Sequence, residues 1–422
     1  MRRSKPLLSL LSLAATVLLT GCAVTPAAFE RADSAHTLTV WTYLAGDEEE
    51  VNFAKLDELF TRSHPDVRIR RVAIPLGEFT PKLLAAAATG DGPDIVIGNP
   101  VVDFPLLSKA HVYADLTERW QRWPEHSKFS DIGLWRDDKG RLDAIHWRFN
   151  DLGLWYNKDI LEAEHIPVPR TLPEFEAALR TVAQNGKQRP LTVAGDPSVQ
   201  AAWSSMMWLY TQHVNYCTLN SPRTTDVLAM LAGWLRKGYL PIDTSSLPIE
   251  TAFDRFLSGN YAFTIGGSWE LGKLRSEPPT FRYGSAMIPS GKAGNKMAFA
   301  GESVGIGAYA KNKDLAWSYL TTSYLSKRAQ LVTFRQTGAL PPRLDIRRGP
   351  RVSGDPVARP FVAALEPSVL QPWPDNPNTL EAQTDVGAAF STLFSGDVSG
   401  AEIAEQIRSD VTRALKDGGG GC

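Results

Sequence analysis

From residue 36 onward, short apolar runs alternate with amphipathic segments along the chain. The run LTVWTYL is followed by apolar residues at helical spacing, Phe53, Leu56, Leu59 and Phe60, and then by VRIRRVAI. The later run DIVIG is apolar on both faces, which is typical of a parallel strand covered by helices. This order predicts a β-α-β-α-β unit with right-handed crossovers.

The second helix of this unit carries its own start and stop signals. Thr80 precedes Pro81, and proline is favoured at the first helical position because it has no N–H to leave unpaired. Gly90 follows the apolar stretch and is typical of a helix end. We therefore predict a helix that Thr80 caps and Gly90 terminates.

The same alternation returns in the middle of the chain. LGLWYN predicts a strand and 158–164 a helix, and Thr171 with Glu174 has the capping-box pattern before another helix. Further strands are predicted at YAFTIGG, FRYGSAMIP and SVGIGAYA, and helices at 225–237, 314–330 and 400–415. The Pro-, Gly- and Arg-rich stretch 343–360 is the best linker candidate. These elements predict a second α/β unit.

Composition agrees with a globular protein of two units. The chain has 422 residues, 43% of them hydrophobic and 22% charged, and this length exceeds the usual size of one hydrophobic core. Lys and Arg number 45 against 46 Asp and Glu, so no overall charge excess favours nucleic acid as a partner.

The N-terminus has the pattern of a bacterial export signal. Basic residues precede the apolar run 7–19, which is short for a membrane span, and small residues follow it. The letters LTGC, ending at Cys22, resemble a lipobox, which implies cleavage before Cys22 and a lipid on its thiol. We expect residues 1–21 to be a signal peptide and 22–36 a tether; an uncleaved anchor is the disfavoured alternative.

Two cysteines remain beyond the signal, Cys217 and Cys422, too few for a disulfide framework or a zinc site. Cys217 is expected to be a small buried side chain. Cys422 ends a glycine-rich stretch, 418–422, that we expect to be a flexible tail, and whether the two cysteines pair stays open. The chain has no Walker A run, HExxH, EF-hand loop or CxxC, so we predict no cofactor and no metal.

The stretch GESVG, 301–305, has the letters of the nucleophile elbow of serine hydrolases. That interpretation makes Ser303 a nucleophile and requires a histidine later in the chain. All seven histidines precede Ser303, so this hypothesis is disfavoured. We predict no catalytic residue and no enzyme activity.

A series of stretches carries a family resemblance. They are, in order, the lipobox, VWTYLAGDEEE, GDGPDIVIGNP, LWYNKDILEAEHIPVPRTLPEFEAAL, FLSGNYAFTIGGSW, FAGESVGIGAYAKNKDLAWSYLTTSYLS and TGALPPR. Together they resemble the family 1 extracytoplasmic solute-binding proteins, the sugar-binding lipoproteins of bacterial ABC importers related to maltose-binding protein. LWYNKD followed by a helix and a T-x-P-E-F start is a fairly specific mark, and the resemblance covers residues 37–417.

The resemblance implies an α/β fold of two lobes, the type II-like periplasmic-binding-protein fold, with the ligand in the cleft between them. The expected division is 37–149 and 303–344 for lobe 1, and 150–302 and 345–417 for lobe 2. The expected hinge consists of crossing segments near Trp147–Leu152, Ala300–Gly305 and Arg343–Gly349.

The resemblance also implies a function. Such a protein binds a carbohydrate, closes its lobes over it and presents it to the permease subunits of an ABC importer. We expect a monomer, held by lipid at Cys22 on the extracytoplasmic face of the cell membrane, with no nucleic-acid partner.

A sugar presents apolar faces and polar edges, so its site needs planar aromatic side chains together with hydrogen-bond donors and acceptors. The resemblance places four tryptophans on the cleft, Trp41, Trp147, Trp269 and Trp373. Gly267, two residues before Trp269, allows close backbone approach and presents the indole at the end of a strand.

The polar candidates lie at strand ends and on the crossing segments. They are Asp47, Asn99, Arg148, Asn150, Asp151, Gly301, Glu302, Ser303 and Arg343. Structural roles compete with ligand contact, since Asp47 belongs to an acidic run that suits a helix N-terminus, and Arg148 and Asp151 are oppositely charged neighbours.

Two other functions stay open. Arg148, with the arginines at 343, 347 and 348, would suit an anionic sugar derivative or a glycerophosphodiester. Asp151 and Glu302 would suit a secreted glycosidase that uses one carboxyl group as acid and the other as base.

Overall fold

Nine strands form the framework of the part of the chain that the structure describes. They are β1 (Thr37–Thr42), β2 (Arg68–Ala73), β3 (Ile95–Gly98), β4 (Leu134–Arg136), β5 (Leu142–Asn157), β6 (Arg189–Thr192), β7 (Tyr261–Gly267), β8 (Tyr283–Ala286) and β9 (Phe299–Ile306). The computed structural model describes residues 36–292, 294 and 296–419. Within these residues the sheet order is β2-β1-β3-β9-β5-β7-β6, and β4 and β8 pair with β5 beside this path.

Sixteen helices surround the described strands. They are α1 (Asp47–Thr61), α2 (Leu76–Ala88), α3 (Pro100–Lys109), α4 (Thr117–Arg122), α5 (Lys158–Ala163), α6 (Leu172–Asn185), α7 (Val199–Tyr210), α8 (Pro222–Arg236), α9 (Ile249–Leu257), α10 (Glu270–Ser276), α11 (Lys313–Ser323), α12 (Lys327–Thr337), α13 (Leu344–Arg347), α14 (Arg359–Ala364), α15 (Thr379–Ser395) and α16 (Gly400–Asp417). Single 3-10 turns lie at His126–Lys128, Asp131–Gly133 and Thr244–Ser246.

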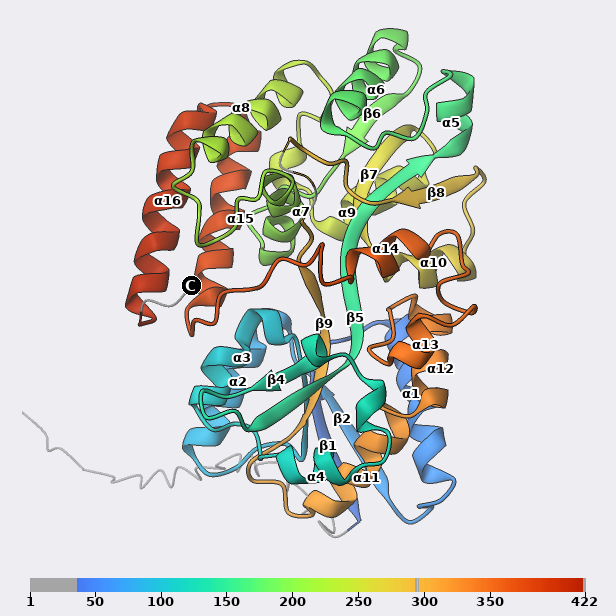
Figure 1. The fold of residues 1–422 in the computed structure, drawn as a ribbon, viewed down its shortest axis with the longest axis vertical. Coiled ribbons are helices and arrows are strands. Elements are labelled where there is room, and N and C mark those ends of the chain that lie inside the picture. The colour runs from blue at the N-terminus through green and yellow to red at the C-terminus, as the bar shows by residue number, and fades with distance from the viewer. Residues whose placement is uncertain (1–35, 293, 295, 420–422) are drawn as a thin grey trace, which may run out of the picture.

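The strands β5 and β9 connect a lower and an upper lobe (Figure 1). They pair antiparallel from Ile145–Val304 to Asp151–Phe299, and the far end of β5 pairs with β7 and β8 of the upper lobe. β9 continues downward to pair with β3 of the lower lobe. The lobe boundaries expected at 149/150 and 302/303 fall within this paired stretch.

The lower lobe contains the expected β-α-β-α-β unit, because β1 pairs parallel with both β2 and β3. The apolar face of α1 buries Phe53, Leu56 and Phe60 completely or nearly so, against Leu38 and Val40 of β1. Helices α11 and α12 pack on α1 and complete this core.

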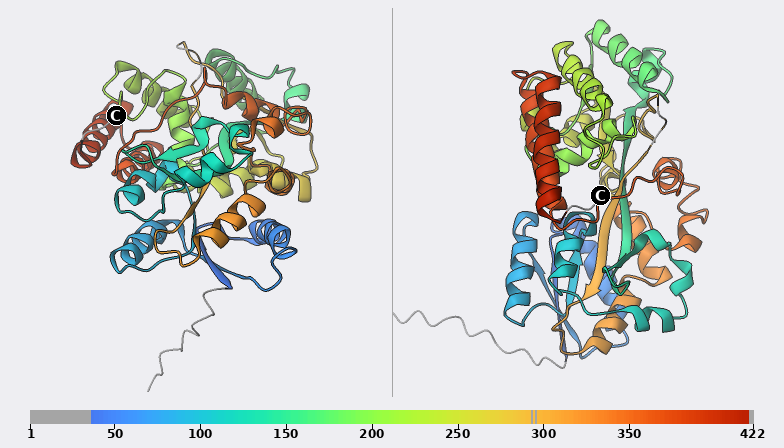
Figure 2. Two further views of the ribbon diagram at one scale, coloured as in Figure 1. Left: turned by 60° about the horizontal axis from the view of Figure 1, so that its bottom comes forward. Right: turned by 60° about the vertical axis from the view of Figure 1, so that its left-hand side comes forward.

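The upper lobe is built on β5, β6 and β7, with β6 parallel to β7. The expected N-cap of α6 is present, since the Thr171 hydroxyl accepts a hydrogen bond from the Glu174 N–H at 3.4 Å. Helices α15 and α16 lie side by side and pack against α7 and α8 (Figure 2). The C-terminal part of the chain therefore belongs to this lobe.

The second helix begins earlier than the sequence predicts. α2 starts at Leu76 after Pro75 and places Thr80 and Pro81 inside the helix. The additional turn brings Phe79 onto the buried face beside Leu83. The Thr80 hydroxyl donates to the Asp103 carboxylate at 3.1 Å instead of capping the helix.

Two other predicted elements are also divided differently. The single helix expected over 314–330 is two helices, α11 and α12, because the backbone leaves the helical conformation at Tyr324 and Ser326 caps a new helix. The third connection between the lobes follows α13 and so begins within the expected segment Arg343–Gly349, since α13 packs on α12 of the lower lobe and α14 packs on β5 and β8. The predicted linker 343–360 is therefore partly helical.

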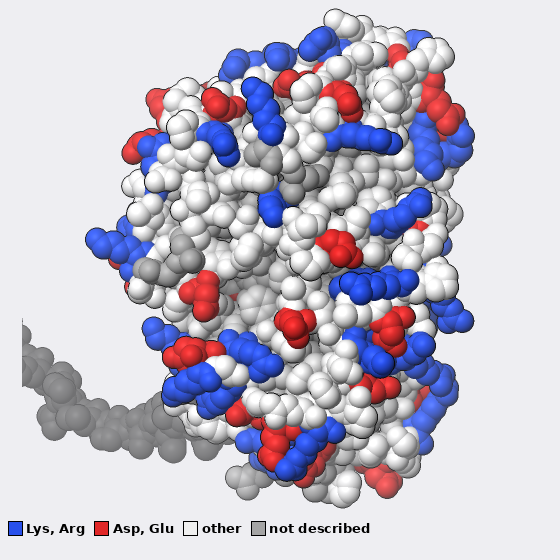
Figure 3. Space-filling model, viewed as in Figure 1, with Lys and Arg blue, Asp and Glu red and all other residues white. Residues whose placement is uncertain are grey.

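The prediction that Cys217 is a small buried side chain is wrong, because this residue is exposed and disulfide-bonded. The other cysteines, Cys22 and Cys422, lie outside the described residues, as do the predicted signal peptide and almost all of the tether. Over 36–292, 294 and 296–419, none of the helices combines the length and the apolar character needed to cross a membrane. The face drawn in Figure 3 intersperses basic and acidic side chains, in keeping with the balanced composition.

Candidate ligand-binding site

A cavity of about 390 Å³ lies between the two lobes and beside the crossing strands. The lower lobe contributes the loop after β1 and the start of α1, and the upper lobe contributes residues of α7, α9 and α10. Seven of the predicted site residues line it: Asp47, Asn99, Arg148, Asn150, Trp269, Gly301 and Glu302. The structure thus brings together residues from five separate stretches of the sequence.

Arg148 organises the floor of this cavity. Its Nε donates to Glu302 Oε2, and its Nη1 forms an ion pair with Glu49 Oε1 at 2.7 Å. Two further groups hold Glu302, since the Tyr43 hydroxyl donates to Oε1 at 2.6 Å and the Asn150 amide to Oε2 at 3.3 Å. Burial, and then the Glu302 carboxylate, raise the pKa of Tyr43 well above its usual value, so the hydroxyl remains a donor.

Gly301 allows β9 to run close to β5 at this point. Its φ of 125° lies in the region that favours glycine, and a Cβ there would lie 2.3 Å from the Arg148 carbonyl oxygen. A larger residue would push the two crossing strands apart. Gly301 therefore helps to fix the position of Glu302 on the cavity floor.

Two half-buried indoles stand at the upper side of the cavity, those of Trp269 and Trp203. Trp269 lies directly over Gly267, where a Cβ would come within 2.1 Å of its ring carbons. Gly267 thus acts through Trp269 and does not line the cavity. Trp203 could not be predicted from the sequence, because it lies in an apolar helix with no local signal that separates it from a core residue.

The alternation of β5 explains why other candidates lie outside the cavity. Arg148 and Asn150 face it, so Trp147 and Asp151 turn to the other side of the strand. Trp147 is fully buried against Phe53 and Tyr324, and Trp41 packs into the lower lobe. Neither Trp147 nor Trp41 lines the cavity, so the structure does not support their predicted contact with a ligand.

Ser303 and Trp373 do not line the main cavity either. Ser303 is 1% exposed and pairs in the sheet with Gly98, which leaves it inaccessible as a nucleophile. The indole N–H of Trp373 donates to the Phe299 carbonyl oxygen at 2.6 Å. Trp373 instead borders a small neighbouring cavity, together with Trp203, Trp269 and Asp151.

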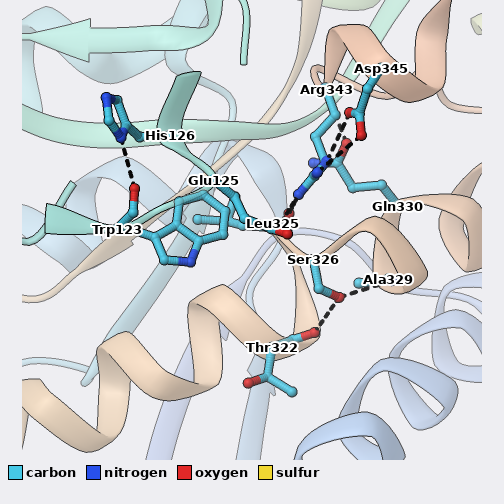
Figure 4. Close-up of polar contacts among 10 residues, drawn as sticks. All are labelled: Trp123, Glu125, His126, Thr322, Leu325, Ser326, Ala329, Gln330, Arg343 and Asp345. Carbon is cyan, nitrogen blue, oxygen red and sulfur yellow. Dashed lines mark hydrogen bonds and ion pairs between the residues drawn. The ribbon is translucent and has the colours of Figure 1, made fainter. Parts of the chain in front are cut away.

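Arg343 is a structural residue of the lower lobe (Figure 4). Its guanidinium pairs with Glu125 and forms two hydrogen bonds of 3.1 Å to the Asp345 carboxylate. Its backbone N–H donates to Gln330 Oε1 at 3.2 Å. The arginines predicted for an anionic ligand, Arg148 with those at 343, 347 and 348, therefore do not gather at one site, because only Arg148 lines the cavity, and Arg148 and Arg343 are each paired with carboxylates in separate places.

The pair expected for a glycosidase is also separated. Glu302 is held by Arg148 on the cavity floor, whereas Asp151 is buried on the other face of β5, and neither of its carboxylate oxygens has a hydrogen-bond partner among the described residues. Burial raises the pKa of Asp151 well above its usual value, and the nearby Arg347 opposes this shift. Glu302 lines the main cavity and Asp151 only the small neighbouring one, so the two groups do not face one common cavity.

Residues 55–360 match the family model described as bacterial extracellular solute-binding protein. The chain belongs to this family. It is therefore a solute-binding protein and not an enzyme, which confirms the expected binding function. The family also indicates that the protein acts outside the cytoplasm.

Two curated relatives resemble this solute-binding protein. The multiple sugar-binding protein of Streptococcus mutans is 23% identical over 373 residues, which are 85% of this chain and 83% of the relative. The melibiose/raffinose/stachyose-binding protein MelE of Bacillus subtilis is 22% identical over 229 residues, which are 53% of this chain and 51% of the relative.

Solved structures confirm the two-lobe α/β fold. The GacH receptor of Streptomyces glaucescens, studied unliganded and with acarbose, has a TM-score of 0.76 at 22% identity, covering 90% of this chain and 98% of the receptor. Maltose-bound MalE3 of T. maritima has a TM-score of 0.78 at 19% identity, covering 90% of this chain and all of that structure (100%). These likenesses establish the fold.

A further pair of hydrogen bonds ties the cavity wall to the opposite lobe. The Trp203 indole N–H donates to Gln383 Oε1 at 2.6 Å, and Gln383 Nε2 donates to the Val101 carbonyl oxygen at 2.8 Å. Trp203 and Gln383 belong to the upper lobe and Val101 to α3 of the lower lobe. Separation of the lobes would break the second bond, so Gln383 favours the closed form of the solute-binding protein.

Gln383→Leu is expected to weaken ligand binding about tenfold. Without this hydrogen bond, the closed form is less stable relative to the open form by about 1–3 kcal/mol. Calorimetric titration with the bound ligand measures the change. Thr384→Ala is the matched control, since that neighbouring hydroxyl bonds only within α15, to the Leu380 carbonyl oxygen. Unchanged affinity in Gln383→Leu would show that the bond does not contribute to closure.

Proposed function

We propose that this solute-binding protein captures a carbohydrate between its two lobes and delivers it to the permease subunits of an ABC importer. The observation that carries the proposal is the combination of two half-buried indoles, Trp203 and Trp269, with a floor of carboxylate and amide groups. Indole faces suit the CH faces of a sugar ring, and the polar groups suit its hydroxyls. A volume of about 390 Å³ is within the usual range for small-molecule sites.

The relatives support the same ligand class. Both curated relatives are named for sugars that they bind, and the two structural neighbours were studied with acarbose and with maltose. The paired state of Arg148 and Arg343 argues against an anionic ligand, which would need free cationic groups.

The sequence supports a lipid anchor at Cys22, preceded by a cleaved signal at 1–21. The folded lobes would then stay close to the outer face of the cell membrane, where one tethered monomer serves a permease. Incorporation of labelled lipid into the wild-type chain, and its loss in Cys22→Ser, is the expected result.

A thermal-shift screen tests the ligand class. We expect a neutral or amine-bearing sugar to raise the melting temperature, because a ligand that binds only the native state at a hundred times its Kd adds about 2.7 kcal/mol. The panel contains mono-, di- and oligosaccharides, amino sugars and glycerophosphodiesters. A stabilising effect confined to the phosphodiesters, or no effect from any sugar, would contradict the proposal.

A further inference from the structure

The lining of the cavity is strongly acidic. Among the described residues it includes six carboxylates and two cationic groups. The carboxylates are those of Asp47, Glu48, Glu49, Glu250, Glu270 and Glu302, and the cations are Arg148 and Lys273. Closing two lobes over this excess of negative charge is unfavourable unless a cation accompanies it or some of the carboxylates take up protons.

Both cations of the lining already have carboxylate partners. Arg148 pairs with Glu49 and Glu302 on the floor. Lys273 pairs with Asp254, which is not one of the lining residues. The cavity therefore offers a ligand carboxylates that these two cations do not directly neutralise, and it offers no unpaired cation for an anion.

Two of these carboxylates approach from opposite lobes. Glu48 extends from α1 of the lower lobe toward α10, and a Cβ added to Gly272 would lie 1.7 Å from its Oε1. This Oε1 is buried without a hydrogen-bond partner among the described residues. Glu270 begins α10 of the upper lobe and is only 6% exposed. Both residues line the cavity, where Glu48 is half-buried and Glu270 is buried.

Burial is the main influence on both groups. It raises the pKa of Glu48 to about 7, with Glu49 raising it further and Arg148 and Lys273 opposing. It raises the pKa of Glu270 to about 8, with Lys273 and the Trp269 side chain opposing and Glu250 and Asp254 adding to the rise. Both side chains are thus largely or partly protonated at pH 7, although each has a partial counter-charge in Lys273.

Asn99 independently indicates a ligand with hydrogen-bond donors. It is 3% exposed, lines the same cavity, and its Oδ1 has no hydrogen-bond partner among the described residues. Although Asn99 occupies the N-cap position of α3, its side chain makes no capping hydrogen bond. A buried acceptor of this kind is normally satisfied, so a donor from the ligand is the expected partner.

We propose that the solute is a sugar bearing a protonated amino group, whose ammonium binds on the side of the cavity formed by Glu48 and Glu270. This inference rests on the proposed function and narrows its ligand class. An ammonium group supplies up to three donors and a positive charge, which matches unpaired acceptors in an acidic, partly buried space. A neutral sugar would satisfy the acceptors but would not stabilise the ionised forms of Glu48 and Glu270.

Calorimetry with matched sugars tests the proposal on the chain from residue 22 onward, produced without lipid. The probes are glucosamine, galactosamine and the glucosamine disaccharide, each beside its N-acetylated form and its hydroxyl counterpart. We expect the amines to bind about tenfold more tightly or better at pH 7. Titration in buffers of different ionisation enthalpy is expected to show proton release, because the ammonium favours the ionised forms of Glu48 and Glu270.

Substitutions of single carboxyl groups test whether Glu48 and Glu270 cause the preference for amino sugars. Glu48→Gln and Glu270→Gln are each expected to reduce the ratio of amine to neutral affinity at least severalfold, whereas Glu58→Gln, an exposed position on the same helix α1, leaves the ratio unchanged. Neutral sugars that bind as tightly as their amines would overturn this inference and leave the proposed function standing. Failure of every sugar, charged or neutral, would overturn the proposed function itself.

Discussion

Replacing Arg148 by methionine is expected to lower the free energy of unfolding by about 3–5 kcal/mol. The guanidinium is 4% exposed and pairs with Glu302 and Glu49, so its removal leaves buried negative charge without a partner. Chemical denaturation followed by circular dichroism measures the loss. The effect is large because the residue joins the lower lobe to the crossing strands at the cavity floor.

Two comparisons make the Arg148 prediction specific. Arg62→Met removes an exposed ion pair with Glu58 and is expected to change stability by less than about 1 kcal/mol. The double variant Arg148→Met with Glu302→Gln is expected to recover part of the loss, since it removes one of the unpaired charges. A loss below 1 kcal/mol in Arg148→Met alone would mean that the floor does not depend on this ion pair.

Trp269→Ala is expected to weaken sugar binding by about 2–3 kcal/mol, or roughly 30- to 150-fold in Kd, because a central aromatic contact carries much of the energy of such a site. The indole is half-buried, lines the cavity and lies over Gly267. Calorimetric titration with the sugar selected by the thermal-shift screen gives the change.

Trp317→Ala is the matched control for Trp269→Ala. Trp317 is also half-buried, but it lies on α11 of the lower lobe beside Trp123 and does not line the cavity. Its replacement is expected to leave sugar affinity unchanged. Equal affinities in the wild type and in Trp269→Ala would remove this tryptophan from the binding site.

The overall organisation could be predicted because it depends on local patterns and on the family resemblance. The parallel unit around β1 follows from apolar periodicity, and the capping role of Thr171 follows from a short motif. The start of α2 could not be placed in the same way. There, burial of Phe79 outweighed the local signal of Thr80 and Pro81.

The site was only partly predictable, since each strand has two faces and the sequence does not say which one borders the cavity. The candidates at 147–151 include both faces of β5, of which only Arg148 and Asn150 line it. Trp203 and Gln383 are 180 positions apart and meet only in the folded chain. From the sequence, the acidic run at the start of α1 indicates mainly helix stabilisation, whereas in the structure Glu48 and Glu49 also line the cavity.

The most direct measurement is a crystal structure of the chain with the sugar that stabilises it most. We predict density for the sugar in the cavity between the lobes, with a ring face against Trp269 or Trp203 and polar groups within hydrogen-bond reach of Asn99, Asn150 or Glu48. A sugar bound on an outer surface, with the interlobe cavity empty, would contradict the account.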